Sequence, residues 1–571
     1  MTTAFPRTPL LVAASAAGIA LTYYFSYVHQ DDGARWQVGG ATKVIIQANK
    51  PKNPGLSDLR AETQSGTLAA TDTLVREQRS LGQPMAQLAP TAPADAIFQL
   101  ALPPDAFEQF ANEQPHGVVS VAQNPVSTFS VDVDTASYSV LRSSLTSGRM
   151  PTPESVRIEE MINYFPYGYR PPVGDEQPFA TAVSVFETPW NSNTQLMRIA
   201  IQGRAPDTET RPPLNLVFLI DTSGSMQAHN KLPLLVQSLK LLLKQLDPED
   251  EVAVVTYAGH AGTVLEPTPA SETTAIVSAL DQLNAGGSTA GQAGLHQAYA
   301  MAESMLSEGE LTRVILATDG DFNVGISDPD QLKDYIEDKR ETGSYLSVLG
   351  FGRGNINDQI MQSLAQNGNG TAAYIDTLSE AQKVLVDQLS GALFPIADDV
   401  KIQVEFNPST VAEYRLIGYE TRPLERADFN NDRVDAGEIG AGHSVTALYE
   451  ITPVGSPATL HDPLRYEPVV DPQVTEDELA FVRIRHKRPG EDVSQLFEVP
   501  VPAVLEAPGE DARFAAAIAG FGQLIRDDSY LGTWGYDDAI ALANGARGED
   551  PFGYRTEAVT LMRLAEAIVG G

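Results

Sequence analysis

Five oxygen-bearing side chains have the types and spacing needed to bind a small metal ion. They are Asp221, Ser223, Ser225, Thr289 and Asp319. The first three form an Asp-x-Ser-x-Ser motif after an apolar run, the last follows a second apolar run, and the threonine ends a Gly-Gly-Ser-Thr segment between them. Carboxylate and hydroxyl oxygens are hard ligands, and the set has no nitrogen or sulfur to favour zinc or copper. The residues therefore predict a Mg²⁺ site, with Mn²⁺ as the alternative ion.

An alternation of strands and helices is needed to bring these side chains together. Apolar runs typical of strands buried on both faces occupy residues 215–220, 252–257, 313–317, 345–351 and 371–375. The i, i+3, i+4, i+7 spacing of a helix face, or a similar pattern, occupies residues 232–246, 271–283, 291–306, 358–366 and 379–389. The alternation predicts an α/β fold with a doubly wound, mainly parallel, Rossmann-like sheet. Its ligand crevice is expected at the carboxyl ends of the strands, where both aspartates lie.

With these residues the chain resembles the von Willebrand factor type A (VWA) domain. The metal-ion-dependent adhesion site (MIDAS) of that family consists of Asp-x-Ser-x-Ser, a distant Thr and a later Asp, and all five positions are present here. The resemblance implies that the bound ion keeps an open position, which accepts a Glu or Asp carboxylate from a protein partner. It implies binding and no catalysis, so we expect the protein not to be an enzyme.

Segments on both sides of this unit resemble the flanking regions of a group of bacterial VWA proteins. They are FSVDVDTASY at residues 129–138, PESVRIEEMINYF at 153–165, YRLIGYE at 414–420 and DFNNDRVDAGEIGAGH at 428–443. The resemblance therefore covers about residues 126–571. Members of the group are often exported, many as lipoproteins, but this chain has no cysteine that could carry a lipid.

The flanking regions are rich in predicted strands. Strand patterns occupy residues 179–187, 196–202, 400–406, 445–451 and 479–484. We expect strands from both sides to combine into a β-sandwich-like domain with the VWA domain inserted between its halves. Two helical faces after residue 505 predict a small C-terminal helical unit. The expected division is 1–30 signal anchor or signal peptide, 31–125 disordered spacer, 126–210 N-terminal flanking region of helices then strands, 211–395 VWA domain, 396–505 β-rich flanking domain and 506–571 helical unit.

The uncharged run at residues 10–28 predicts a membrane connection. As a helix it would extend about 28 Å, close to the thickness of the hydrocarbon core. Arg7 precedes it and Asp31 and Asp32 follow, which favours a cytoplasmic start and an exported body. A signal peptide cleaved near residues 18–20 is the alternative. Both interpretations predict a protein of the cell envelope, anchored in the inner membrane with a periplasmic body, or released into the periplasm.

Overall charge excludes one class of partner. Acidic residues number 74 and basic residues 39, giving a net charge of −35, so nucleic acid is not an expected ligand. Arg483, Arg485 and Lys487 alternate along one predicted strand, where they could dock an acidic partner. Neutralisation of neighbouring acidic groups of the same chain is the favoured interpretation.

Two other aspartate motifs resemble sites with a chemical function. Asp132 and Asp134 resemble the nucleophile loop of phosphatases that form an aspartyl phosphate, but the threonine comes one residue too early. Asp428, Asn430 and Asp432 resemble the start of a calcium loop, but an arginine stands where that loop needs glycine. Both motifs are better explained as turn or helix-start residues.

Three functional hypotheses follow. The first is an extracytoplasmic protein that binds a protein ligand through Mg²⁺ at the five residues. The second is an assembly or chaperone-linked subunit that works with an AAA-type ATPase, which export would exclude. The third is a metal-assisted hydrolase, which needs a base beside the ion, and neither His229 nor Asp321 has a demonstrable geometry for that role.

Overall fold

The structure is a computed structural model, which describes residues 108–111, 114–174, 176–205, 211–288, 291–320, 329–388, 391, 393–462 and 477–570. All of them belong to one compact unit, Ile97–Gly571. The predicted membrane segment at residues 10–28, most of the predicted spacer at 31–125, and Thr289 lie outside the described residues. Among the helices that are described, none is long and apolar enough to cross a membrane.

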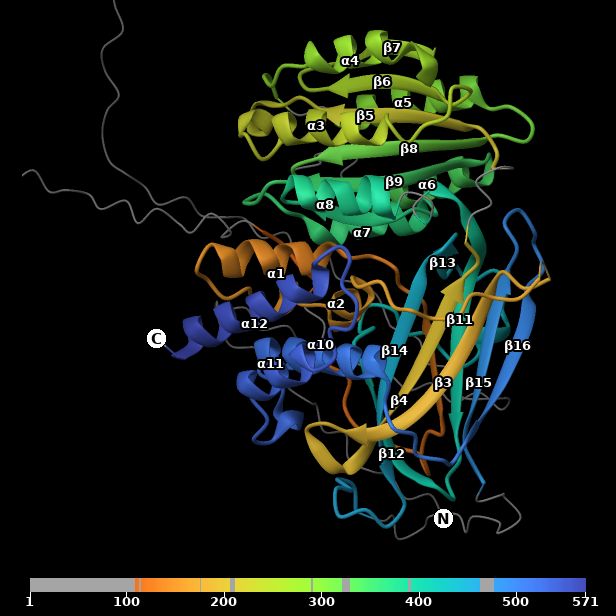
Figure 1. Ribbon diagram of the computed structural model, residues 1–571. Coiled ribbons are helices and arrows are strands. Elements are labelled where there is room, and N and C mark those ends of the chain that lie inside the picture. The colour runs from red at the N-terminus through yellow and green to blue at the C-terminus, as the bar shows by residue number, and fades with distance from the viewer. Residues whose placement is uncertain are drawn as a thin grey trace, which may run out of the picture. The chain divides into compact units, whose positions relative to one another are not determined.

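A six-stranded sheet forms the centre of the predicted VWA domain (Figure 1). The strands lie in the order β10-β9-β8-β5-β6-β7, and all neighbours are parallel except the edge strand β7. Their bounds are β5 Leu214–Asp221, β6 Glu251–Tyr257, β7 Ala261–Pro269, β8 Leu311–Thr318, β9 Ser344–Phe351 and β10 Ala372–Ile375. Every residue of β5 is buried, as expected for a central strand covered on both faces.

Helices cover both faces of this sheet. Leu216, Phe218 and Ile220 of β5 pack with α3, α4 and α8, whereas Val217 and Leu219 pack with α5, α6 and α7. The bounds are α3 Leu232–Leu242, α4 Thr273–Asp281, α5 Gly291–Met305, α6 Pro329–Glu341, α7 Asp358–Asn367 and α8 Leu378–Gln382, which continues as a π-helical turn, Lys383–Asp387. The arrangement confirms the predicted doubly wound α/β fold.

Two antiparallel sheets are built from the segments before and after the central unit, and they pack face to face. The first has the order β1-β12-β14-β4-β3; in the second, β13-β11-β15-β16, strand β2 also pairs with β11. The bounds are β1 Val119–Ser120, β2 Val126–Ser130, β3 Phe179–Thr188, β4 Asn191–Gly203, β11 Pro395–Phe406, β12 Val411–Ile417, β13 Gly437–Gly440, β14 Ser444–Pro453, β15 Glu478–Lys487 and β16 Gln495–Pro502. One buried apolar cluster joins the two sheets. Each sheet combines strands from before and after the central unit, as the sequence predicts.

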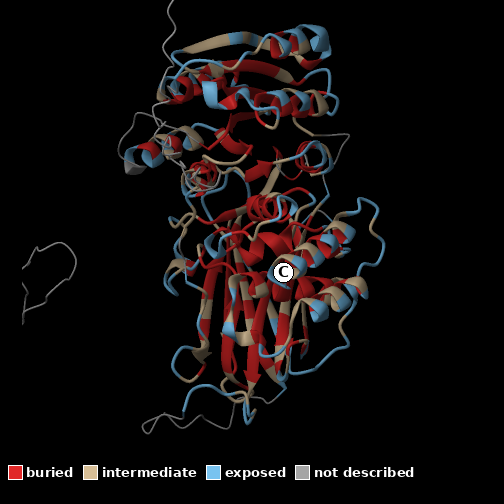
Figure 2. Ribbon diagram, turned by 90° about the vertical axis from the view of Figure 1, so that its left-hand side faces the viewer, coloured by how far each residue is buried: buried red, intermediate tan, exposed pale blue. Residues whose placement is uncertain are grey.

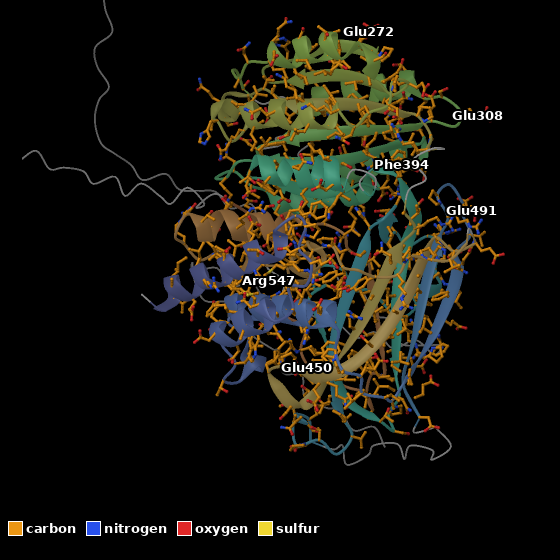
Figure 3. All side chains as sticks on the ribbon, viewed as in Figure 1. Glu272, Glu308, Phe394, Glu450, Glu491 and Arg547 are labelled. Carbon is orange, nitrogen blue, oxygen red and sulfur yellow. The ribbon has the colours of Figure 1, made fainter. Side chains whose placement is uncertain are left out.

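The central unit leaves and rejoins the sandwich at one place. The backbone N–H of Gly442 donates to the carbonyl of Arg204 at 2.7 Å, and the N–H of Ala441 donates to the carbonyl of Phe394 at 2.8 Å. Arg204 follows β4 and Phe394, labelled in Figure 3, precedes β11. Because neighbouring residues hold both ends, the insertion leaves the pairing of the sandwich strands intact.

The C-terminal helices form a third layer with two helices from the N-terminal flank. The helices are α1 Ala136–Thr146, α2 Ile158–Asn163, α10 Glu510–Arg526, α11 Tyr536–Asn544 and α12 Tyr554–Gly570. They share one buried cluster, to which Phe186, Leu196 and Leu448 of the first sheet also belong. Figure 2 colours the buried residues of the protein red. The C-terminal helices are therefore part of a common core with the sandwich.

Short helical turns complete the described elements: η1 Pro153–Ser155, η2 Gly224–Gln227, η3 Ala270–Glu272, η5 Asp428–Asn430 and η6 Ser529–Leu531. At the N-terminal side, β1 pairs with β12 through Val119 and Tyr414, and Val121 is buried. Packing in this part of the chain therefore begins before the expected boundary at residue 126.

Candidate metal centre

The two predicted carboxylate ligands come from neighbouring parallel strands. Asp221 is the last residue of β5, and Asp319 directly follows β8. The strands pair in parallel, with Ile220 opposite Ala317, so their carboxyl ends reach the same edge of the sheet. Both aspartates are fully buried. The order and register of the sheet therefore bring together two residues almost one hundred positions apart in the chain.

The Asp-x-Ser-x-Ser loop is folded around the first carboxylate. The N–H of Ser223 donates to Asp221 Oδ1 at 2.8 Å, which forms a tight turn after the strand. Thr318 Oγ1 makes a long contact of 3.5 Å with Asp221 Oδ2. The hydroxyl oxygens of Ser223 and Ser225 lie 2.9 Å apart and hydrogen bond to each other. Two hydroxyl groups and one carboxylate thus gather within one short loop.

A second loop is held against the first by the backbone. The N–H of Gly224 donates to the carbonyl of Gly287 at 3.1 Å, and the N–H of Gly286 donates to the carbonyl of Thr222 at 2.7 Å. Gly287 has φ +93°, a conformation that favours glycine. Thr289 comes two residues later and lies outside the described residues. The structure therefore places the residues just before Thr289 beside the Asp-x-Ser-x-Ser loop.

A lysine ammonium group contacts the second carboxylate, that of Asp319. Lys231 Nζ donates to Asp319 Oδ2 at 2.8 Å, and the side chain of Lys231 is only 9% exposed. Asn355 Nδ2 makes a longer contact of 3.5 Å with the same oxygen. Lys231 was not predicted from the sequence, because a lysine before an apolar helix has the pattern of an ordinary surface residue. A lysine ten residues after the Asp-x-Ser-x-Ser aspartate, followed directly by that helix, was the only available signal.

Burial sets the protonation of the first aspartate. Loss of solvent raises the pKa of Asp221 to about 6; hydrogen bonds from Ser223 oppose the rise, and the charge of Asp319 adds to it. A cation near Asp221 would favour its ionised form. The carboxylates and hydroxyl groups fit a hard divalent cation such as Mg²⁺.

The donor set differs from clustered metal sites of other kinds. In the part of the chain that the structure describes, no three histidine, cysteine, aspartate or glutamate side chains come together in a way that could hold a metal ion. The predicted set has only two carboxylates and depends on hydroxyl groups for its remaining ligands. Such a site needs a further oxygen ligand from water or from a partner.

The segment at residues 108–111 lies next to the same edge of the sheet. Glu108 accepts hydrogen bonds from Arg353 Nε at 2.7 Å and from the N–H of Gly354 at 2.8 Å. These residues precede Asn355, the residue that contacts Asp319. The chain that leads into the sandwich is therefore fixed to a loop of the candidate site.

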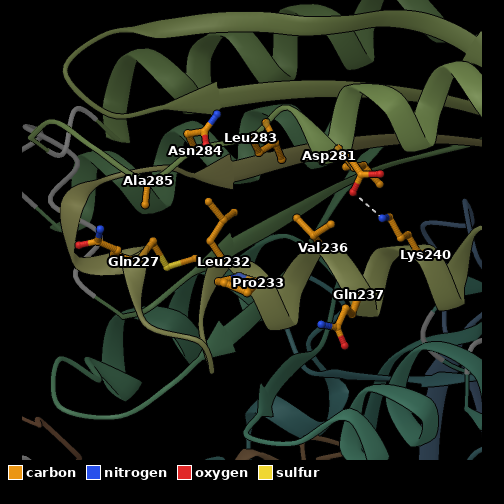
Figure 4. A pocket seen from close by; sticks show the side chains of 12 residues that line it. Gln227, Leu232, Pro233, Val236, Gln237, Lys240, Asp281, Leu283, Asn284 and Ala285 are labelled. Carbon is orange, nitrogen blue, oxygen red and sulfur yellow. Dashed lines mark hydrogen bonds and ion pairs between the residues drawn. The ribbon is translucent and has the colours of Figure 1, made fainter.

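A groove of about 430 Å³ opens between α3 and α4 (Figure 4). Met226 and Gln227 of η2 contribute to it, so the groove adjoins the loop that carries Ser225. An ion pair between Lys240 and Asp281 joins the two helices at the groove. The surface beside the Asp-x-Ser-x-Ser loop is therefore partly apolar.

The competing aspartate motifs have structural partners. Arg422 Nε donates to Asp132 Oδ2 at 2.9 Å, and Asp134 Oδ1 accepts from the N–H of Ala372 at 2.8 Å. Asp428 accepts from the N–H of Glu425 in a turn. The contact of Asp428 supports the turn interpretation of its motif. Asp132 and Asp134 instead contact distant parts of the chain, and neither forms a side-chain cap on the helix that follows.

Two of the three basic residues on β15, Arg483 and Lys487, contact acidic groups of the same chain. Lys487 Nζ lies 2.6 Å from Asp399 Oδ2, and Arg483 lies 3.3 Å from Glu405. This agrees with neutralisation of neighbouring charges within the protein.

Comparison with known proteins defines the class. The chain matches the family model of the von Willebrand factor type A domain at residues 215–388, and a model named von Willebrand factor at residues 105–198. It is therefore a VWA protein, a class whose domains generally mediate protein–protein interaction and commonly bind a divalent metal. A further model, for the C-terminal region of the uncharacterized protein YfbK, matches residues 391–568.

The family within this class follows from a relative that matches most of the chain. The uncharacterized protein YfbK of Escherichia coli (strain K12) is 45% identical over 463 residues, which cover 79% of this chain and 80% of that protein. The chain belongs to the YfbK family.

Other similarities are more partial. The uncharacterized protein sll0103 of Synechocystis sp. is 32% identical over 32% of this chain and 43% of its own length. The inter-alpha-trypsin inhibitor heavy chain H4 of Bos taurus is 27% identical over 36% of this chain and 23% of its own length. A solved structure, von Willebrand factor type A from Catenulispora acidiphila, has a TM-score of 0.40 and 16% identity, and the match covers 70% of this chain and 91% of that one.

Proposed function

We propose that the protein binds a protein ligand through a divalent cation, Mg²⁺ or Mn²⁺, at Asp221, Ser223, Ser225, Thr289 and Asp319. The meeting of Asp221 and Asp319 at one sheet edge is the observation that carries the proposal. When bound, the cation supplies a positive centre that attracts a carboxylate. The partner would contribute a Glu or Asp side chain, and no covalent bond is made or broken.

The residues around the ion have separate tasks in this proposal. The hydroxyl groups of Ser223 and Ser225, which hydrogen bond to each other in this structure, would hold the cation. The turn at Asp221 holds the loop in place through the Ser223 N–H. Specificity would come from the surrounding surface, including the groove between α3 and α4.

We also propose that the folded body acts outside the cytoplasm, in the cell envelope. This proposal rests on the uncharged run at residues 10–28 and on the charges that flank it. A reporter fused after residue 30 tests it: activity only of a periplasmic reporter supports export, and activity only of a cytoplasmic reporter contradicts it.

The binding proposal is tested by affinity capture from native envelope extract with the full chain. We expect a partner to be retained by the wild type in Mg²⁺ and lost with EDTA. Asp221→Ala removes a carboxylate ligand and should abolish capture even in Mg²⁺. Asp492→Ala, at an exposed residue between β15 and β16, is the control and should capture normally. Equal capture by wild type and Asp221→Ala, both folded by circular dichroism, would contradict the proposal.

A further inference from the structure

The ion pair between Lys231 and Asp319 is an unusual feature of the candidate site. The two residues lie 88 positions apart in the chain, and both side chains are buried. A surface lysine in water gains little from such a contact, but a buried charge needs a partner. Lys231 therefore neutralises part of the negative charge of the predicted ligand set.

The fold leaves a specific path for the lysine side chain. Gly352, directly after β9, has φ +78°. A Cβ atom built there would lie 2.6 Å from Lys231 Cγ and 2.7 Å from its Cε, so a larger residue would displace the lysine side chain from its present position. The backbone of Lys231 is fixed as well, because its carbonyl accepts from the N–H of Leu235 at 2.8 Å in the first turn of α3. The helix start therefore fixes the backbone of Lys231, and Gly352 leaves room for its side chain to reach Asp319.

We propose that Lys231 couples metal binding to ligand binding at this site, an inference that rests on the proposed function. Ionised Asp221 and Asp319 carry two negative charges, and Lys231 reduces this to one. A divalent cation then gives the site a net charge of +1, which the carboxylate of a partner neutralises. Without Lys231 the cation alone would neutralise the site, and the carboxylate would be attracted less strongly.

This charge balance has two opposite consequences. The ammonium group repels the incoming cation and competes with it for Asp319, so it weakens metal binding in the absence of a ligand. The same group favours the ternary state, in which protein, cation and carboxylate are together. By thermodynamic linkage, the ligand then strengthens metal binding and the metal strengthens ligand binding.

The test is the Mg²⁺ affinity of the full chain, measured by isothermal titration calorimetry for wild type, Lys231→Met and a matched control. Lys333→Met is the control, because it removes the same charge from an exposed ion pair on α6. We expect Lys231→Met to bind Mg²⁺ about tenfold more tightly than wild type, since a unit charge within a few ångströms of a partly buried ion is removed. Lys333→Met should bind as wild type does.

A second variant and a carboxylate probe complete the test. Lys231→Gln keeps a hydrogen-bond donor without the charge, and should also bind Mg²⁺ more tightly if loss of the charge is the cause. Sodium acetate, compared with sodium chloride at equal ionic strength, should raise the Mg²⁺ affinity of wild type more than that of either variant at position 231.

The outcomes separate this inference from the proposed function. Equal or weaker Mg²⁺ binding by both variants at position 231, or an equal effect of acetate on all chains, overturns the coupling while the metal site itself stands. Mg²⁺ binding by the variants and none by wild type supports the inference in its strongest form. No Mg²⁺ binding by any of the chains overturns the metal site and the coupling together.

Discussion

At the scale of single residues, Glu159 of α2 is a carboxyl group in an unfavourable place. It is fully buried, and loss of solvent raises its pKa to about 8, with the charges of Glu420, Asp132 and Glu160 adding to the rise. A carboxyl group with a raised pKa holds its proton more tightly in the folded state than in the unfolded state. Its contribution to the free energy of unfolding therefore falls as pH rises from about 4.5 to about 8.

Glu159→Gln should remove this contribution. One proton sets a maximum slope of about 1.4 kcal/mol per pH unit, so we expect the variant to gain stability over wild type as pH rises from 5 to 8. Urea unfolding at several pH values measures the difference. Glu154→Gln, at an exposed residue of η1, is the control and should follow wild type. Parallel curves for Glu159→Gln and wild type would contradict the assignment.

The candidate site could be predicted only in part at this scale. Asp221 and Asp319 were predictable, because one ends and the other directly follows a strand whose apolar run is visible in the sequence. Lys231 was not, because its role depends on the space left by Gly352, more than one hundred residues away. Such a contact requires the packed tertiary structure and leaves no local pattern.

At the scale of elements, Arg142 of α1 forms ion pairs with the C-terminal part of the VWA domain. Its guanidinium donates to Asp376, after β10, at 3.0 Å and to Glu380, in α8, at 2.8 Å, and all three side chains are nearly buried. Arg142→Met would leave two buried carboxylates without their cation. We expect a loss of about 3–5 kcal/mol in the free energy of unfolding, measured with urea.

The control for this variant is Lys240→Met, whose ion pair is exposed and should contribute no more than about 1 kcal/mol. A loss for Arg142→Met as small as that of the control would show that the contacts between α1 and α8 do not stabilise the fold.

Two elements of the VWA domain, one strand and one helix, were not predicted from the sequence, for physical reasons. The edge strand β7 is only half-buried and lacks the alternation of apolar and polar residues that marks a strand. Helix α6 buries Leu332 and Ile336 against the sheet, but its other residues are mostly polar or charged. The five parallel strands were predictable because burial on both faces makes them continuously apolar.

At the scale of the whole molecule, the strand pairs that build the sandwich form across the inserted VWA domain. β4 pairs with β14 over eight residues, from Ser444 opposite Gln202 to Ile451 opposite Gln195. The sequence predicted that strands from both sides would combine, but not their order or register, because such distant pairings have no local signal. The packing of α1 and α2 with the C-terminal helices in one core was not predicted, for the same reason.

The most direct test of the account is a calorimetric titration of Mg²⁺ into the full chain and its Asp221→Ala variant, with acetate present to supply a carboxylate. The account predicts one Mg²⁺ site in wild type and none in Asp221→Ala, with both proteins showing the same cooperative unfolding in EDTA. Equal Mg²⁺ binding by the two proteins, or no binding by wild type, would contradict it.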